Sequence, residues 1–480
     1  MGCVLKKICE IKNWYAATCL LFIVSAAAVA WAQESPPPNQ GQNSTTDESI
    51  HDSDPKVESM FPHFEKGPFW ISGQMNFIFQ THPGFPAKYS GQNSLNPHYE
   101  KATSRLMTLY TALRFDDSTE VLLDIEESGQ EGLSSSLGVA GFPNLDVVRN
   151  PSLSKAPYIA RVMIDKVFSF GGQSIENERG PLSVFDELPA RRLEIHAGKF
   201  SMVDFFDLNS VGSDSHLQFE NWAIDNNGAY DYAADTRGYT WGMVADYEDR
   251  NWGLRFAEAL MPKVANGIDL VWNLRKARAE NVEFELRYGL IPKKSGIVRL
   301  LGFSNHANMG VYRDAVAQFE EGKIAAPDIT AHPFRTTQKY GFGINIEQSL
   351  TSDLVAFARW GWNNGRTESF AYTEIDSTFV EGLGVYGSLW HRKQDRAGIA
   401  FDSSAISKDH QSYLAQGGYG FIIGDGALNY GRENILETYY TAHVWRGIYV
   451  APGLQHINNP AYNRDRGPVI IPTFRVHVEY

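Results

Sequence analysis

The last seven residues of the chain, 474–480 (FRVHVEY), alternate strictly between apolar and polar side chains. Because successive side chains of a strand point to opposite faces, Phe474, Val476, Val478 and Tyr480 share one face, and the polar residues share the other. Such an ending fits an edge strand of a soluble sheet or a strand of a transmembrane β-barrel. The rest of the sequence has to distinguish these two folds.

The N-terminus predicts export from the cytoplasm. Three lysines precede an apolar run over residues 19–30 (CLLFIVSAAAVA), and Ala30-Trp31-Ala32 is a small-x-small cleavage site. This pattern indicates a signal peptide over residues 1–32 and a mature chain that starts at Gln33. The apolar run is too short for a spanning helix, and later apolar runs are interrupted by residues such as Pro292 or Arg299.

The composition fits an exported barrel. The mean hydropathy of -0.31 is too polar for a helical membrane protein, but a barrel hides its apolar face in alternation. Cys3, Cys9 and Cys19 all lie in the predicted signal peptide, so the mature fold has no disulfide to rely on. The formal charge of -13 becomes about -15 without the signal peptide, which argues against nucleic acid as a partner.

The mature chain divides into two parts. Residues 33–60 are rich in Pro, Gln, Ser and Asp, and we expect them to form a disordered periplasmic leader. Residues 61–480 alternate repeatedly between an apolar and a polar face, for example over 71–80, 120–126, 282–288, 342–347, 356–362 and 396–402. About 410 residues at roughly 23 to 26 per strand predict an all-β transmembrane antiparallel barrel of 16 strands, with 18 as the alternative.

Aromatic residues and turns give the barrel its predicted polarity. Aromatic girdles at the two membrane interfaces are expected from Tyr239, Trp241, Tyr247, Trp252, Trp360, Trp362, Tyr449 and Tyr480. Short polar turns at 115–118, 246–251, 350–353 and 424–426 are expected on the periplasmic side. The longer segments 81–97, 129–157 and 307–333 are expected to be external or pore-folded loops.

Two blocks of sequence resemble the carbohydrate-selective porin family (OprB type). The first lies within 193–267 and includes AGKF (197–200), DFFD (204–207), FENWA (219–223), NNGA (226–229), YAADTRGY (232–239) and MPKVANG (261–267). The second comprises ETYY (437–440) and LQHINNPAYNRDRGP (454–468). The resemblance implies an outer-membrane channel for sugars and leaves the sugar unidentified.

The residues of the first block also suit sugar recognition on chemical grounds. Planar polar groups bond hydroxyls, and aromatic faces stack on the CH edges of a pyranose. The candidate channel-binding residues are Phe206, Asp207, Asn221, Trp222, Asn227, Asp235 and Arg237, with Glu285 and Arg287 as lumen charges on the strand that contains 282–288. The alternative for Asn227 and Asp235 is that they fold a tight loop by bonding their own backbone.

The sequence offers little support for catalysis. The histidines are scattered without metal-ligand spacing, and there is no P-loop or GxSxG motif, so we expect no enzyme activity, no metal and no cofactor. The expected function is facilitated diffusion of carbohydrates across the outer membrane. The alternatives are a general porin for other small polar solutes and, third, a barrel hydrolase such as an outer-membrane lipase.

The expected partners follow from that function. They are sugars as transported solutes, outer-membrane lipid, and the barrel-assembly machinery, which would recognise the C-terminal strand. Trimers are common among porins, but no interface for a homotrimer is legible in the sequence.

Overall fold

The computed structural model describes residues 56–64, 66–129, 131–148, 150, 153–292 and 294–480. The predicted signal peptide, and the predicted leader up to residue 55, lie outside the described residues and stay predictions. Among the described residues, no helix is long and apolar enough to cross a membrane.

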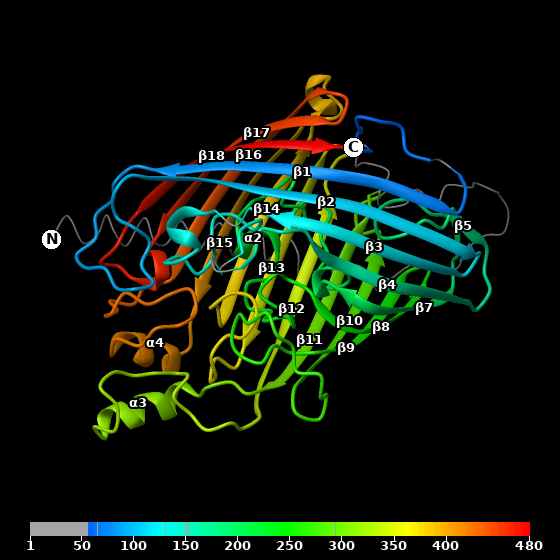
Figure 1. The fold of residues 1–480 in the computed structure, drawn as a ribbon. Coiled ribbons are helices and arrows are strands. Elements are labelled where there is room, and N and C mark those ends of the chain that lie inside the picture. The colour runs from blue at the N-terminus through cyan, green and yellow to red at the C-terminus, as the bar shows by residue number, and fades with distance from the viewer. Residues whose placement is uncertain (1–55, 65, 130, 149, 151–152, 293) are drawn as a thin grey trace, which may run out of the picture.

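The alternating segments form a closed, antiparallel barrel of 16 strands, which confirms the predicted fold class (Figure 1). Each barrel strand pairs with its neighbours in the sequence, and the first strand pairs with the last. The barrel strands are β1 (Phe69–His82), β2 (Glu100–Asp116), β3 (Thr119–Ser128), β4 (Tyr158–Ser169), β7 (Arg192–Phe200), β8 (Thr240–Asp249), β9 (Trp252–Ala259), β10 (Arg278–Tyr288), β11 (Gly296–Ala307), β12 (Thr337–Ser349), β13 (Leu354–Asn363), β14 (Ser377–Tyr386), β15 (Arg396–Ala405), β16 (Glu433–Trp445), β17 (Ile448–Asn458) and β18 (Val469–Glu479).

Strand β10 shows how the alternation sorts side chains between lipid and lumen. Val282, Phe284 and Leu286 are exposed on the outside of the barrel, whereas Glu283 and Glu285 are buried inside. A barrel in a membrane needs this arrangement because lipid surrounds it and its polar side chains must find partners within. The register predicted for this strand is therefore confirmed.

The C-terminal strand closes the wall. Strand β18 pairs with β1 from Gln74↔Glu479 to Gln80↔Thr473. Two backbone hydrogen bonds between Gly73 and Tyr480 extend this pairing to the last residue of the chain. Closure leaves no unpaired strand edge facing lipid, where an unsatisfied backbone would be costly.

The two ends of the barrel differ. At the short-turn end, where β1 begins, tight connections such as 117–118, 250–251, 350–353 and 446–447 join the strands. One connection there is longer, because 170–191 contains the hairpin of β5 (Ser174–Glu176) and β6 (Glu187–Pro189). The sequence analysis did not anticipate this hairpin.

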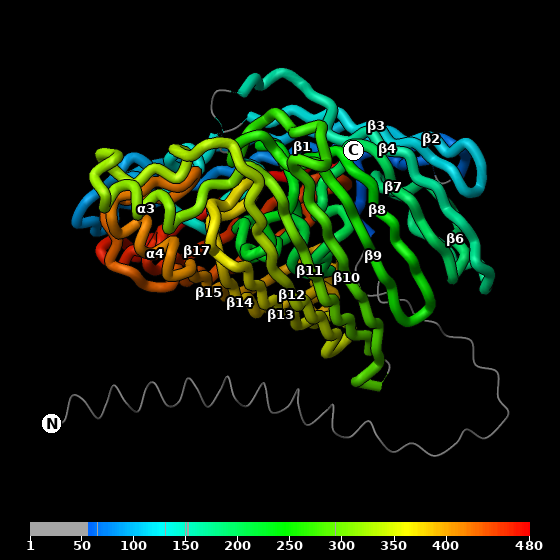
Figure 2. The backbone as a smooth tube through the Cα atoms, turned by 90° about the horizontal axis from the view of Figure 1, so that it is seen from below, coloured from blue at the N-terminus to red at the C-terminus, as the bar shows by residue number. Residues whose placement is uncertain are grey.

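The connections that alternate with these lie at the long-loop end, among them 83–99, 129–157, 201–239, 260–277 and 308–336. Helices α3 (Tyr312–Glu320) and α4 (Lys408–Ala415) pack together there, at the end of the barrel opposite to β6 (Figure 2). In outer-membrane barrels, short turns are periplasmic and long loops are extracellular, so the long-loop end is the outer mouth.

Two of the predicted girdle residues and one predicted periplasmic turn are placed wrongly. Tyr239 and Tyr449 are buried rather than part of a lipid-facing girdle. The hydroxyl of Tyr239 donates to Glu126 at 3.0 Å, and that of Tyr449 accepts a hydrogen bond from the backbone of Glu58 at 2.8 Å. The predicted turn 424–426 belongs to the connection between β15 and β16 and therefore lies at the long-loop end.

Candidate functional site

The loop between β7 and β8, residues 201–239, folds into the barrel instead of standing above it. We call it the constriction segment. Every residue in it is buried or half-buried, although the segment is rich in Asp, Asn and Gly. Helix α2 (Trp222–Asp225) lies in the middle of this segment and is enclosed by the barrel strands (Figure 1). So many buried polar groups require partners, and the barrel wall supplies them.

The chain turns inward directly after β7. The side chain of Ser201 and that of Asp204 each bond the other residue's backbone, which forms a capping box around η3 (Met202–Asp204). Arg161 of β4 then donates two hydrogen bonds to the Asp204 carboxylate, at 2.6 and 2.7 Å. This charged pair fixes the first turn of the segment against the wall. Phe206 follows, fully buried in an apolar cluster, so it is a packing residue in this structure.

Asp207 and Arg359 form the central anchor of the constriction segment. The Arg359 Nε lies 3.0 Å from Oδ2 of Asp207, and both side chains are buried. The same guanidinium donates to the carbonyls of Gly212 and Ile224, both at 2.8 Å. One wall residue thus ties together three points of the segment that lie far apart in the sequence.

Asn227 packs against two glycines of the barrel wall. Its backbone N–H donates to Asp207 at 2.8 Å, and its Oδ1 accepts from Ala229 at 3.1 Å, which is a loop-folding role. Gly343 and Gly361 face it from β12 and β13. A Cβ on Gly361 would lie 2.0 Å from Asn227 Oδ1, so only glycine permits this approach.

Asn221 fixes the entry into α2. Its Oδ1 accepts from the backbone of Ala223 as the helix N-cap, and its Nδ2 donates to Gly141 at 2.6 Å and to Gln455 at 3.1 Å. Glu437 of β16 accepts the backbone N–H groups of Glu220 and Asn221 at 2.7 and 3.1 Å. The amide of Asn221 is therefore fully engaged in holding the segment.

An aromatic row lies on the constriction segment. Trp222 stacks on Tyr372 with ring centroids 5.6 Å apart and planes 10° from parallel, and Tyr232 lies 4.7 Å from Tyr372. The indole Nε1 of Trp222 donates to Asn144 at 2.8 Å. Burial raises the pKa of the neighbouring Asp225 well above its usual value, an effect that the charge of Arg359 opposes. The row joins two outer loops to the segment.

Asp235 and Arg237 close the segment at the outer mouth. Asp235 Oδ1 accepts the backbone N–H of Arg237 at 2.8 Å and that of Tyr239 at 3.3 Å, and burial raises its pKa. The half-buried Arg237 stacks its guanidinium 3.7 Å from the ring centroid of Tyr158. Its Nη2 donates to the carbonyl of Ser154 at 3.2 Å, and its Nη1 is buried.

A second charged group lies on the wall nearer the short-turn end. We call it the wall charge cluster. Its centre is Arg255, whose guanidinium lies 2.7 to 3.2 Å from four carboxylates. Glu285 joins Arg255 to Arg287 and Arg299 at 2.7 to 3.0 Å. The cluster comprises Asp246, Glu248, Arg255, Glu283, Glu285, Arg287 and Arg299.

The structure thus divides the predicted site residues. Phe206, Asp207, Asn221, Trp222, Asn227, Asp235 and Arg237 belong to one continuous segment, whereas Glu285 and Arg287 belong to the separate wall charge cluster. The sequence analysis missed the anchoring residues Arg359 and Glu437, and Tyr372 of the aromatic row. Arg359 is a charge at a lumen position of an alternating strand, which is a usable signal. No local pattern marks Tyr372. Among the described residues, no group of three or more His, Cys, Asp or Glu side chains is placed to hold a metal ion.

Comparison with known proteins identifies the family of this chain. The model of the carbohydrate-selective porin family, OprB, matches residues 93–480. The chain belongs to this family. As an OprB-family porin, it is a channel for carbohydrates in the outer membrane.

A solved structure shares the fold of this OprB-family porin. The high-pH structure of OprB from Pseudomonas putida has a TM-score of 0.65 at 15% identity, over 86% of this chain and 94% of that one. The low-pH structure of the same protein gives 0.46 at 12% identity, over 86% and 93%. The outer-membrane channel DcaP of Acinetobacter baumannii gives 0.47 at 8% identity, over 86% and 97%. A search of curated protein sequences finds no match.

Proposed function

We propose that carbohydrates diffuse through this porin along a path with three stations. The first is Arg237 with the ring of Tyr158 at the outer mouth. The second is the aromatic row of Trp222, Tyr232 and Tyr372, and the third is the wall charge cluster. Solutes pass by diffusion, without a chemical reaction.

The stacking of the half-buried Arg237 on the ring of Tyr158, at the outer mouth, is the observation that carries the proposal. A guanidinium stacked on an aromatic ring suits a sugar that offers both hydroxyls and a CH face. In contrast, the side-chain groups of Asp207 and Asn221 already bond protein atoms. We therefore assign these two residues to holding the constriction segment, and Arg237 to contacting the solute.

Sugar block of ion current through single channels tests the role of Arg237. Arg237→Ala should weaken block by sugars about fivefold, the equivalent of ~1 kcal/mol for one lost hydrogen bond. Arg275→Ala, which removes a cation outside the barrel, is the matched control. Sugars should block its ion current as strongly as that of the parent. If Arg237→Ala also blocks like the parent while inserting normally, the segment is architectural and selectivity resides in other loops.

Liposome swelling separates a sugar channel from a general porin. Mono-, di- and trisaccharides should enter faster than amino acids of similar size. Equal rates for both solute classes would favour the general porin. Phospholipid hydrolysis by the purified protein would contradict a purely diffusive role. Recognition of β18 by the barrel-assembly machinery and assembly into a homotrimer stay predictions.

A further inference from the structure

The loop between β9 and β10, residues 260–277, exposes large apolar side chains. Trp272 is 71% exposed and Val264 is 60% exposed, and Ile268 and Leu274 on the same loop are also exposed. Phe334, from the neighbouring connection between β11 and β12, is exposed beside this loop and lies 6.0 Å from Lys276 Nζ. We call Val264, Ile268, Trp272, Leu274 and Phe334, together with Arg275 and Lys276, the rim patch. An apolar surface of this kind needs a non-aqueous neighbour.

The rim patch continues the lipid-facing surface of the barrel. Trp272 packs on Trp241 of β8, with ring centroids 5.7 Å apart. The wall below it is low, because β7, β8 and β9 have only 9, 10 and 8 residues. A tilted strand of eight residues spans about 20 Å, less than the roughly 25 Å apolar band of an outer-membrane barrel. Trp272 extends the apolar band on this side.

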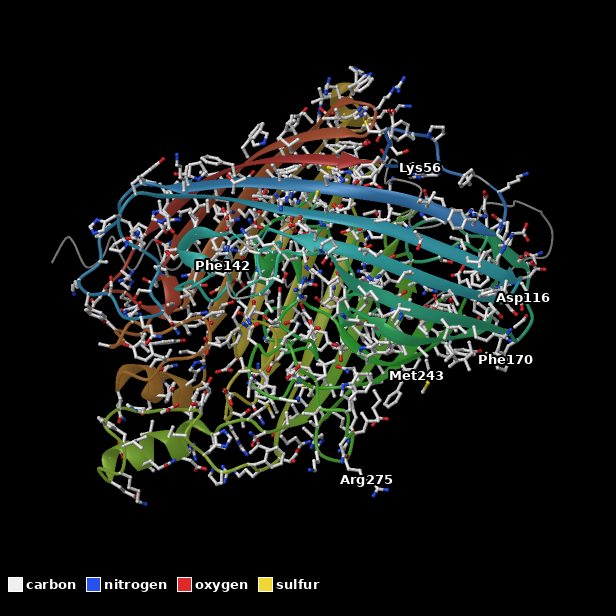
Figure 3. All side chains as sticks on the ribbon, viewed as in Figure 1. Lys56, Asp116, Phe142, Phe170, Met243 and Arg275 are labelled. Atoms are coloured by element: carbon white, nitrogen blue, oxygen red, sulfur yellow. The ribbon has the colours of Figure 1, made fainter. Side chains whose placement is uncertain are left out.

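Two cations lie on the same loop, close to the start of β10. Figure 3 shows Arg275 projecting from the loop away from the barrel. Arg275 and Lys276 are both exposed, and no carboxylate pairs with either of them in the part of the chain that the structure describes. The neighbouring cations are already neutralised, since Lys263 pairs with Asp269 at 3.2 Å and Arg335 with Asp314 at 2.5 Å. The loop thus offers two free positive charges on a protein whose formal net charge is -13.

We propose that the rim patch binds a phosphate-bearing lipid of the outer leaflet. The acyl chains lie against Trp272, Val264 and Ile268, and the phosphate lies between Arg275 and Lys276. Exposed apolar side chains and unpaired cations on one loop can contact both parts of an anionic lipid, its acyl chains and its phosphate. Charge complementarity selects an anionic lipid over a second copy of this acidic protein.

The depth of the patch can be measured with a fluorescent label, because the mature chain is predicted to contain no cysteine. Val264→Cys carries a polarity-sensitive dye in phosphatidylcholine vesicles, and Ser412→Cys on the exposed face of α4 is the matched control. The Val264 label should emit at shorter wavelength and be quenched by lipids brominated on their acyl chains, whereas the Ser412 label should report water. Equal, water-like emission from both sites would overturn the proposal.

Lipid selectivity is tested with the full mature porin in detergent micelles. The probe is bisphosphorylated lipid A, and binding is quantified by native mass spectrometry. The double variant Arg275→Gln/Lys276→Gln should bind about thirtyfold more weakly, roughly fivefold per cation. The control Arg250→Gln/Lys393→Gln removes the same charge from exposed positions at the short-turn end and should bind like the parent.

Three results would refute the lipid site. Equal binding of dephosphorylated lipid A would remove the role of the phosphate. Full competition by millimolar inorganic phosphate would make this a site for soluble anions. Dimerisation that the Arg275/Lys276 variant abolishes would assign the patch to a second copy of the chain.

Discussion

The constriction segment (201–239) and the loop that bears the rim patch (260–277) are separated by a single β-hairpin, yet the first folds into the lumen and the second places Trp272 on the outside of the wall. Every residue of the first is buried or half-buried, and the second exposes most of its large side chains. Both belong to the outer mouth, so position in the barrel does not explain the difference. The difference follows from the groups that each segment contacts. The polar groups of the first find Arg359, Glu437 and Asn345 in the lumen, whereas the second has apolar side chains that suit lipid.

The comparison also separates two uses of arginine. Arg359 is buried and holds one carboxylate and several backbone carbonyls, so it acts as part of the framework. Arg275 is exposed, without a carboxylate partner among the described residues, and is available to a ligand. The same residue type is therefore structural on one side of the wall and free for binding on the other.

Removing the central anchor should produce the largest effect. Arg359→Ala leaves the Asp207 carboxylate buried without its cation, which should cost about 3 to 5 kcal/mol of unfolding free energy. It should also release the constriction segment, so single-channel conductance should rise and sugar block should fall. Denaturant unfolding and bilayer recordings measure the two effects. Arg275→Ala on the other side should change stability by less than about 0.5 kcal/mol; comparable losses in both variants would contradict the contrast.

Adding a methyl group at Gly361, which faces Asn227, should have an intermediate effect. Gly361→Ala places a methyl group against Asn227 and should cost about 1 to 3 kcal/mol, because the segment or the strand must move. Gly302→Ala is the matched control, since its Cβ faces outward at an ordinary 3.5 Å from Val282. Thermal unfolding of both variants measures the difference. Adding Asn227→Ala should restore part of the stability of Gly361→Ala, and no restoration would mean that the strain lies elsewhere.

Truncating the exposed aromatic residue should have the smallest effect. Trp272→Ala loses the contact with Trp241, which is worth about 0.5 to 1.5 kcal/mol. Conductance and sugar block should not change, because the residue lies outside the lumen. Unfolding in detergent and in lipid bilayers provides the measurement, and the loss should be greater in bilayers. A changed conductance would place the loop in the solute path instead.

The fold was predictable because its signal is local. Alternation over 282–288 or 474–480 identifies the strand and its two faces, and the sum of such segments gives the strand number. Alternation does not place Tyr239, which precedes β8, and Tyr449 shares its buried face with the apolar Ala451 and Ile457, so both tyrosines were assigned to the wrong side. The same limit applied to the turn 424–426, since a turn motif does not reveal at which end of a barrel it lies.

The route of the constriction segment was not predictable, for a different reason. Its residues suggested a polar, aromatic site, but its inward path depends on residues such as Arg359 and Glu437, more than 130 positions away in the sequence. The loop-folding alternative for Asn227 and Asp235 agrees with their hydrogen bonds. No sequence motif marks the rim patch. Its exposed apolar residues can be interpreted only when the structure shows that they lie beside Trp241 and a short stretch of wall.

The pairing of β1 with β18 determines when the barrel can close. The first strand to leave the ribosome has the last strand as one of its two neighbours, so the barrel lacks a strand until Tyr480 has been synthesised. Throughout translation and export, one edge of β1 has nothing to bond within its own chain. Completion of the wall must therefore follow synthesis, and a chain that is released early cannot finish the ring in lipid.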